Sequence, residues 1–228
     1  MTPQEISVII AALNEAERIE AAIESAWDNG AGEVIVCDGG SEDNTAQLAR
    51  QSATRVVDAP RGRGNQLAIG AAAATRPMLL FLHADNRLGV GCLDLLCRSV
   101  NDSADPRACW GGFRQRIDAG DAIYRWLEWG NALRVRWRGM PFGDQAMFVA
   151  RPLYDAVGGF QMLPLMEDVR LAQALRRRCW PLLIDGRVQV DPRRWNSRGV
   201  VRQTARNWGI QIAHRLGVSE HRLAKWYR

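Results

Sequence analysis

Three short apolar runs of the chain each end on polar residues that could take part in chemistry. Asn14 and Glu15 follow the first run, Asp38 follows the second, and His83 and Asp85 follow the third. Carboxylates are hard ligands for Mg2+ or Mn2+ and can accept hydrogen bonds from a bound molecule. Because ligands bind outside the carboxyl ends of strands in a parallel sheet, we expect these residues to gather at one edge and form a site.

Each of these residues also has a purely structural interpretation. Asp38 could begin an Asx turn, and Asn14 and Asp85 could cap the helices that follow them. Their coincidence after three strands favours binding. The turn from Ala11 to Glu15 lacks the glycine fingerprint of dinucleotide-binding folds, which argues against NAD or FAD as a ligand.

The elements that position these residues alternate between strand and helix. Apolar runs rich in β-branched residues predict the strands, and a helical spacing of apolar residues predicts the helices. The strands are expected at 6–13, 34–37, 56–57 and 78–82, and the helices at 19–26, 44–52 and 66–75. This alternation predicts an α/β fold with a doubly wound, largely parallel sheet through at least residue 100.

Beyond residue 100 the pattern predicts strands at 110–117 and 146–149, one or two strands over 182–190, and helices at 122–133 and 169–179. From Gly199 onward the chain reads as helical and basic. An apolar stripe (Val201, Ala205, Trp208, Ile212 and Leu216) is opposed there by Arg202, Arg206 and Arg215. We therefore expect one α/β domain over residues 1–198 and a basic amphipathic helical extension over 199–228.

The composition of the 228 residues limits the classes of partner. Apolar residues make up 47% of the chain, and 30 basic residues exceed 25 acidic ones. All the basic residues except Lys225 are arginines, which suit bidentate contacts with phosphate or carboxylate, although a GC-rich genome would give the same bias. The five cysteines show no metal-binding spacing, and no apolar run has the length of a membrane span. These features predict a cytoplasmic protein with reduced thiols.

The order and spacing of several stretches resemble family 2 glycosyltransferases, which have the GT-A fold. The matching stretches are Ser7 to Glu15, Val36 to Thr45, Arg61 to Gln66, Leu82 to Asp85 and Met166 to Asp168. With Gly143 to Gln145 and Asn207-Trp208, the set is most similar to the bacterial subgroup called selenodomain-associated transferase 2. The resemblance implies a Rossmann-like, mostly parallel sheet flanked by helices, and a nucleotide-diphosphate sugar as the donor.

The resemblance also implies a role for individual positions. Asp38 would contact the nucleotide base, Asp85 would be the last residue of a DxD motif that binds Mg2+ or Mn2+, and Asp168 would be the catalytic base. The implied nucleotide-sugar site comprises Ala12, Asn14, Glu15, Asp38, Arg61, Arg63, Gln66, Ala84 and Asp85. Asp144 and Gln145 would line the acceptor side or shape a turn, and Glu167 is also expected on the acceptor side.

Simple chemistry is consistent with these roles. A nucleotide diphosphate leaves more easily when a divalent cation offsets its charge, and the arginines at 61 and 63 precede a helix in a glycine-containing loop that can approach phosphate. The alternative for this loop is a solvated flexible segment. An acceptor hydroxyl needs a base, for which Asp168 is the candidate, although Glu167 and Asp168 also suit a helix N-terminus.

Two positions depart from the family pattern. His83 stands where the DxD motif has its first carboxylate, so cation binding would rest on Asp85 with His83 as a second ligand. Ala11 replaces the proline that usually follows the first strand, which would mainly change the shape of the turn.

The expected function is therefore an inverting glycosyltransferase, with a nucleotidyltransferase acting on a sugar phosphate as the nearest alternative. A nucleic-acid-binding module is disfavoured because acidic strand ends would repel a phosphate backbone. The tail helix could dock on the domain core, on a partner subunit in an oligomer, or on the inner membrane face as a peripheral contact. The aromatic residues Tyr124, Trp126, Trp129 and Trp137 could cover a sugar or pack in the core.

Overall fold

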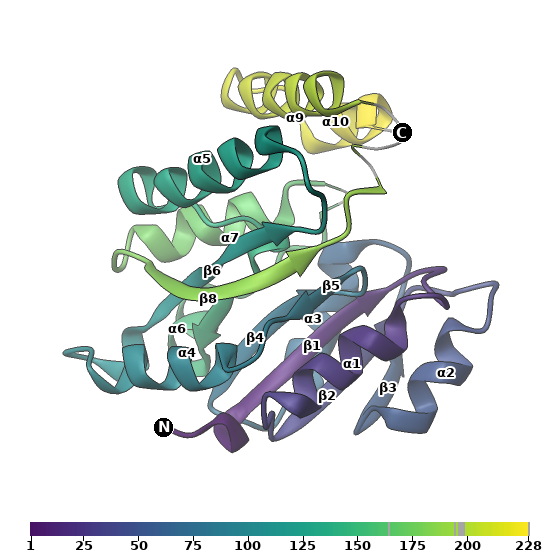
Figure 1. The fold of residues 1–228 in the computed structure, drawn as a ribbon, viewed down its shortest axis with the longest axis vertical. Helices are drawn as coiled ribbons and strands as arrows, with labels where there is room; N and C mark the ends of the chain where they lie inside the picture. Colours follow the sequence, from purple (N-terminus) through teal and green to yellow (C-terminus); the bar gives the residue numbers. More distant parts are fainter. Residues whose placement is uncertain (164, 194, 196–198, 228) are drawn as a thin grey trace.

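The computed structural model describes residues 1–163, 165–193, 195 and 199–227, except the side chains of 201, 215, 221 and 227. These residues form one mixed sheet of eight strands in the order β3-β2-β1-β4-β7-β6-β8-β5, with helices on both faces (Figure 1). The strands are β1 (Ile6–Ala12), β2 (Glu33–Asp38), β3 (Arg55–Asp58), β4 (Met78–His83), β5 (Asn86–Leu88), β6 (Trp110–Ile117), β7 (Phe148–Ala150) and β8 (Leu182–Val190).

The helices lie between these strands and after the last one. They are α1 (Ile19–Asp28), α2 (Thr45–Ser52), α3 (Arg63–Ala73), α4 (Cys92–Asn101), α5 (Ala122–Arg138), α6 (Arg151–Ala156), α7 (Glu167–Arg176), α9 (Val200–Arg215) and α10 (Glu220–Tyr227). A short 3-10 turn, η3 (Gly143–Gln145), precedes β7.

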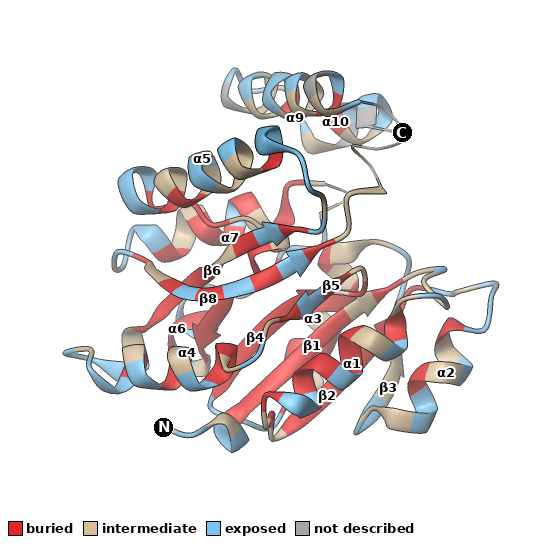
Figure 2. Ribbon diagram, viewed as in Figure 1, coloured by how far each residue is buried: buried red, intermediate tan, exposed pale blue. Residues whose placement is uncertain are grey.

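The first four strands are parallel, as the strand-helix alternation predicts. The register pairs Ala12 with Asp38 and Ala11 with His83, so the ends of β1, β2 and β4 lie at one edge of the sheet. The strands β1 and β2 are buried almost throughout because helices cover both faces of the sheet (Figure 2). This half of the sheet is the rigid base that presents the predicted site residues.

The second half of the sheet is mixed. The strand β7 is antiparallel to both β4 and β6, whereas β8 is parallel to β6, with an irregularity between Phe113 and Arg114. The strand β8 therefore runs in the same direction as β4. The strand β5 is antiparallel to β8 at the far edge, so it is the exception in a part of the chain that is otherwise parallel up to residue 100, as predicted.

Two hydrophobic clusters lie on opposite faces of the sheet. One joins alternate residues of β1 to α1 and α4, and the other joins the intervening residues to α3, α6 and α7. Ile210 of α9 and Leu223 of α10 belong to the second cluster. The C-terminal helices are therefore anchored to the α/β domain, and the division at residue 198 remains a prediction.

The apolar stripe predicted on α9 does not form the face of this helix that packs against the α/β domain. The docked face of α9 carries Gln203 and Ile210, which are 2% and 6% exposed, whereas Trp208, Ile212 and Leu216 are 67%, 54% and 80% exposed. The predicted members Val201 and Arg215 have side chains outside the described part of the structure. The cavity beneath α9 is lined by charged and polar groups, so the helix turns a partly polar face inward.

Other elements differ in length or were not predicted. The helix α3 begins at Arg63, so that the predicted glycine-containing loop is shorter, and α5 continues past Leu133 to Arg138. The elements α4, α6 and β5 were missed. No helix in the described residues is both long enough and apolar enough to cross a bilayer.

Candidate functional site

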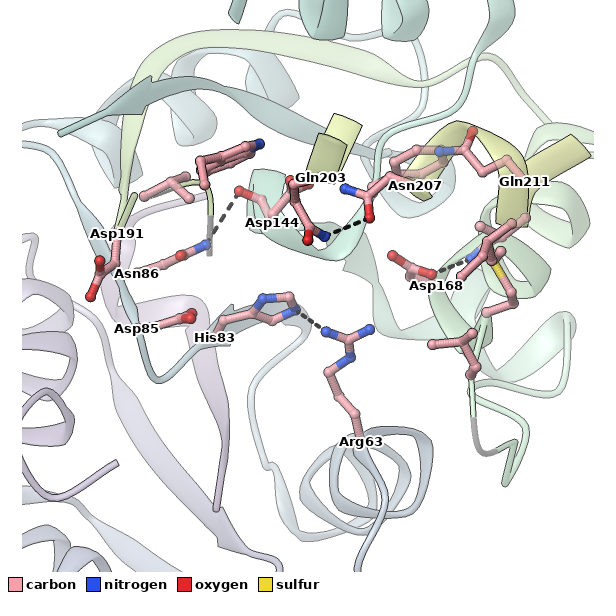
Figure 3. A pocket seen from close by; sticks show the side chains of 17 residues that line it. Arg63, His83, Asp85, Asn86, Asp144, Asp168, Asp191, Gln203, Asn207 and Gln211 are labelled. Carbon is pink, nitrogen blue, oxygen red and sulfur yellow. Dashed lines mark hydrogen bonds between the residues drawn. The ribbon is translucent and has the colours of Figure 1, made fainter. Parts of the chain in front are cut away.

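A pocket of about 170 Å3 lies at the carboxyl end of β4, between the start of α3, the η3 turn, the start of α7 and the polar side of α9. Figure 3 shows Asp85 and Asp191 on one side of it, Asp168 on the other, and Arg63 reaching in from α3. Of the residues predicted for the site, the pocket is lined by Arg63, His83, Asp85, Asp144 and Asp168. Segments far apart in the sequence thus bring both signs of charge into one cavity.

The turns after β1 and β2 are locked together beside this pocket. Asn14, in the left-handed region with a φ of 54°, donates from its main chain to Ser41 Oγ at 3.0 Å and accepts the N–H of Glu42 at 2.8 Å. The main-chain N–H of Glu15 donates to Thr45 Oγ1 at 2.8 Å. These bonds hold both predicted nucleoside-binding turns in a fixed relation.

The Asp38 carboxylate is engaged within its own turn. It accepts the N–H groups of Gly40 and Ser41 at 3.0 and 2.9 Å and the hydroxyl of Ser41, and the residue is only 4% exposed. This is the Asx turn of the structural interpretation. Asp38 is not among the described residues that line the pocket, so contact with a nucleotide base remains a prediction.

Gln66 connects the ends of β1 and β2 through its side chain. Its amide nitrogen donates to the carbonyls of Ala12 and Cys37 at 2.6 and 2.9 Å, and the side chain is buried. These bonds satisfy main-chain acceptors at the ends of β1 and β2, which explains the need for an amide here. Gln66 therefore holds together the edge where a nucleotide sugar is predicted to bind. Arg61 is exposed, Ala84 is buried, and neither residue lines the pocket.

Arg193 connects the turns that follow β1 and β4. It donates to Asp85 Oδ2 at 3.0 Å and to Glu15 Oε2 at 2.9 Å, with a second bond to Glu15 Oε1. These bonds raise the pKa of Arg193, led by the one to Glu15. The same segment is anchored by Asp191, which accepts from Arg18 at 2.6 Å. The chain after β8 is thus tied across the predicted donor site.

A second arginine links the donor side to α7. Arg63 donates from Nε to Glu167, which is 1% exposed, and its NH1 lies 3.4 Å from Nε2 of His83. Because the buried Glu167 carboxylate needs a cationic partner, this pair fixes the guanidinium at the pocket wall. Glu167 is therefore directed at Arg63, and a role on the acceptor side remains a prediction.

Asp168 is held at the pocket by the η3 turn. Its Oδ2 accepts the N–H of Gly143 at 2.8 Å, and its Oδ1 accepts the N–H of Val169 at the same distance. A Cβ at position 143 would lie 2.7 Å from Nε2 of His83 and 3.4 Å from Asp168 Oδ2. Glycine is required here because the turn passes between these two side chains.

The residues that follow Gly143 are buried in different ways. Gln145 is fully buried, where it accepts from Arg134 at 2.7 Å and donates to the Phe113 carbonyl at 3.2 Å. Asp144 lines the pocket, and its Oδ1 is buried without a partner among the described residues. Burial raises the pKa of Asp144, against the attraction of Arg134, and burial lowers the pKa of Arg134 to about 10.

The donor atoms of the pocket fit a divalent cation only in part. Asp85 and His83 offer a carboxylate and an imidazole, and the described residues contain no group of three or more acidic, histidine or cysteine ligands. Mg2+ in particular is commonly held by one or two carboxylates, with substrate phosphates and water completing its shell. The residues therefore fit a cation that shares the oxygens of a bound diphosphate.

Sequence reasoning missed several residues that line the pocket. They are Asn86, Asp191, Trp195, Gln203, Asn207 and Gln211, together with Arg193, which bonds to Asp85. Asp191 and Arg193 follow a predicted strand, but the strand-end rule identifies them only once the structure shows that this strand is parallel to β4. The apolar stripe of α9 hid Gln203 and Gln211, whereas Asn207 entered the sequence analysis only as part of the family resemblance.

The chain is similar in sequence to known glycosyltransferases. The family model described as "Glycosyl transferase family 2" matches residues 7–164, more than half of the chain. An uncharacterized glycosyltransferase of Mycobacterium tuberculosis is 32% identical over 106 residues, which is 46% of this chain and 48% of that protein. A Mycobacterium bovis protein matches to the same extent. The match spans about half the length of these relatives.

Solved structures share the fold at lower sequence identity. S. aureus TarS (residues 1–349) is 15% identical with a TM-score of 0.66, covering 84% of this chain and 61% of that one. The mannosyltransferase PcManGT of Pyrobaculum calidifontis, in complex with GDP-Man and Mn2+, is 20% identical with a TM-score of 0.64, covering 95% of this chain and 62% of that one. The α/β fold expected from the sequence is confirmed as the fold of these glycosyltransferases.

Proposed function

The chain belongs to glycosyl transferase family 2, and on that premise we propose that it transfers a sugar from a nucleotide-diphosphate sugar to an acceptor hydroxyl. The observation that carries the proposal is the presence of Asp168 in one pocket with Arg63, His83 and Asp85. A carboxylate base and groups that bind phosphate or a cation are what such a transfer needs. The subgroup suggested by the sequence remains a prediction.

In the proposed reaction the acceptor oxygen bonds to the anomeric carbon while the bond from that carbon to the diphosphate oxygen breaks. The acceptor proton passes to Asp168, and the nucleoside diphosphate leaves with the electron pair. The carboxylate already accepts the N–H groups of Gly143 and Val169, yet each oxygen keeps a lone pair for the acceptor. One direct displacement of this kind inverts the configuration at the anomeric carbon.

The diphosphate of the donor is proposed to lie between Arg63 and Arg193. Both guanidinium groups can make bidentate contacts with phosphate, and both are fixed by carboxylates at the pocket wall. Asp85 and His83 would hold a divalent cation there, which would neutralise charge on the leaving group. The structure of TarS with UDP-GlcNAc and that of PcManGT with GDP-Man and Mn2+ support this choice of donor and cation.

The nucleoside is proposed to rest on the two locked turns at the ends of β1 and β2. Asn14, Glu15 and Asp38 border this edge, and Gln66 supports it from beneath. Because the Asp38 carboxylate is already engaged by its turn, it would recognise a base through its remaining lone pairs.

Further parts of the proposal concern location and partners. The exposed Trp208, Ile212 and Leu216 beside the exposed Arg202 favour peripheral contact of α9 with an anionic membrane face. The five cysteines are free thiols, which supports a reducing cytoplasmic location. Association into oligomers through the same exposed face is the competing use of these side chains.

A thermal-shift panel tests the donor class. The protein is heated with UDP, GDP, CDP and dTDP sugars, each with Mn2+ or with EDTA. A ligand at 100 times its Kd stabilises the native state by about 2.7 kcal/mol, so one nucleotide class should raise the Tm. Pyrophosphate release from a nucleoside triphosphate and a sugar phosphate, without a shift for any nucleotide sugar, would instead indicate a nucleotidyltransferase.

A further inference from the structure

A second cavity, of about 550 Å3, lies between α5 and α9 and is larger than the pocket that holds Asp168. Figure 1 shows these two helices above the sheet at the C-terminal end of the fold. Six apolar side chains line this cavity and not the catalytic pocket. They are Trp126, Leu127, Leu133, Trp137, Trp208 and Ile212. We call this cavity the α5–α9 groove.

The groove is continuous with the catalytic pocket. Phe142, Asp144, Trp195, Asn207 and Gln211 line both cavities, so they form the passage between them. Asp144 follows Gly143, whose N–H donates to the Asp168 carboxylate at 2.8 Å. A molecule seated in the groove can therefore extend toward the proposed base.

Polar side chains that could bind a ligand are concentrated near this passage. Asn131 donates to Gln115 Oε1 at 2.6 Å, and Arg134 donates to Gln145 Oε1 at 2.7 Å. Asp144 Oδ1 and Arg134 Nε are buried without partners among the described residues. The Arg134 guanidinium lies 3.4 Å from the Phe142 ring centroid, which places a cation at the wall of the passage. An unmet acceptor and an unmet donor at this point suit the polar head of a ligand.

The apolar part of the groove wall suits an apolar chain. Trp126, Trp137 and Trp208 are 70%, 73% and 67% exposed, and Ile212 is 54% exposed. A gathered apolar surface of this kind is unusual on a soluble domain unless a ligand or partner covers it. Asn131, Arg134, Arg138 and Thr204 also line the groove, so the apolar side chains form one part of its wall and polar groups form another.

We propose that the α5–α9 groove binds the apolar chain of an amphiphilic, lipid-type acceptor whose polar head enters the catalytic pocket. This inference rests on the proposed glycosyl transfer and adds the chemical class of the acceptor. The groove places the chain between α5 and α9, and the passage at Asp144 and Asn207 leads the head toward Asp168. Burial of its apolar chain in the groove would therefore select the acceptor. The donor would be recognised at the other side of the pocket.

The test compares alkyl phosphates with chains of 6 and 12 carbons, each brominated at the chain end, as quenchers of tryptophan fluorescence. Burial of a methylene contributes about 0.8 kcal/mol, so partial burial of the added six should tighten binding at least tenfold. Ile212→Asp should weaken binding of the longer chain about fivefold or more, because a charge enters the apolar wall. Leu216→Asp is the matched control, since Leu216 is 80% exposed on the same helix but does not line the groove.

The outcomes separate this inference from the proposed function. Equal binding of both chain lengths, or equal losses in Ile212→Asp and Leu216→Asp, would overturn the groove as the chain site. Equal losses in the two variants would show that the whole exposed face of α9 contributes to binding and that the groove has no specific role. Donor binding is measured separately in the wild-type protein by thermal shift with nucleotide sugars. Chain-length dependence without any donor binding would uphold the groove and contradict the glycosyltransferase assignment of the pocket.

Discussion

Arg193 donates a hydrogen bond of 3.0 Å to Asp85, the carboxylate that the sequence assigns to a divalent cation. The same guanidinium pairs with Glu15, so one arginine neutralises two acidic strand ends. A cation and a diphosphate that enter this site compete with that pairing. On the proposed function, Arg193 would exchange its carboxylate partners for the donor phosphate when a cation binds Asp85.

We expect Arg193→Gln to separate the effect of Arg193 on cation binding from its effect on diphosphate binding. Loss of a partly exposed ion pair is worth about 1 kcal/mol, so the affinity for Mn2+ alone should rise roughly fivefold because Asp85 is released. Binding of the nucleoside diphosphate in EDTA should weaken, since a phosphate ligand is lost. Calorimetry measures both affinities, and Arg98→Gln, at an exposed position of α4 outside the pocket, is the control. Unchanged affinities in Arg193→Gln would contradict this competition.

We expect Asp85→Asn to weaken donor binding chiefly when metal is present. The amide keeps the size of the side chain but removes the charge that holds the cation. Titration of the nucleotide sugar with Mn2+ and with EDTA, in wild type and variant, checks this. A wild-type protein that binds the donor equally well in EDTA would show that Asp85 serves Arg193 rather than a metal.

We expect Gly143→Ala to damage both folding and the site. The added Cβ would lie 2.7 Å from the His83 ring, and overpacking of this kind costs about 1–3 kcal/mol. Urea denaturation gives the free energy of unfolding. Gly209→Ala is the matched control, because position 209 lies within α9 with open space around it, and alanine there should stabilise by about 0.5–1 kcal/mol. A variant at position 143 as stable as the wild type would contradict the close approach.

We expect the docking of α10 to weaken in acid. The pKa of Glu220 is lowered to about 2, first by its own main-chain N–H and then by Arg170 and His214, against an ordinary value of 4.5. Because the folded pKa lies below the unfolded one, this contribution is present above about pH 4.5 and is lost as the pH falls toward 2. Because Arg170 is 46% exposed, solvent screening reduces this contribution to about 1 kcal/mol at neutral pH.

Glu220→Gln should therefore lower the Tm at pH 7 and narrow the gap to wild type as the pH falls below 4.5. Glu24→Gln, at an exposed acidic position of α1, controls for loss of a charge alone. A gap that stays constant with pH would mean that Glu220 contributes through packing and not through its charge.

Much of the first half of the fold could be predicted because each local signal agrees with the tertiary structure. The buried runs of β1, β2 and β4 are apolar on both faces, and their ends carry the polar residues that form the site edge. The same strand-end rule applies to β8, where it would have found Asp191 and Arg193. The sequence alone does not show the direction of β8, because that direction depends on pairings between distant strands.

The remaining features depend on tertiary context. The three residues of β5 are too few to show a pattern, and they form a strand only because β8 supplies an edge. On α9 the strongest apolar stripe faces solvent, because the pocket beneath selects Gln203 and Asn207. The engagement of Asp38 by its own turn was an explicit alternative, but the sequence alone could not decide between it and binding.

The central claim is that Asp168 deprotonates an acceptor in a direct displacement at the anomeric carbon. Slow donor hydrolysis provides a readout in which water takes the place of the acceptor. The nucleotide sugar chosen by thermal shift, with its sugar α-linked to the diphosphate, is incubated with wild type and with Asp168→Asn. Proton NMR then follows the anomeric form of the released sugar, and calorimetry follows donor binding.

The β-anomer should appear first with wild type, because one displacement inverts the configuration. Asp168→Asn should release it about 10²- to 10⁴-fold more slowly, with donor affinity unchanged, because asparagine cannot accept the proton. Release of the α-anomer first, or hydrolysis at the wild-type rate by Asp168→Asn, would contradict the assignment of Asp168 as the base of an inverting transfer.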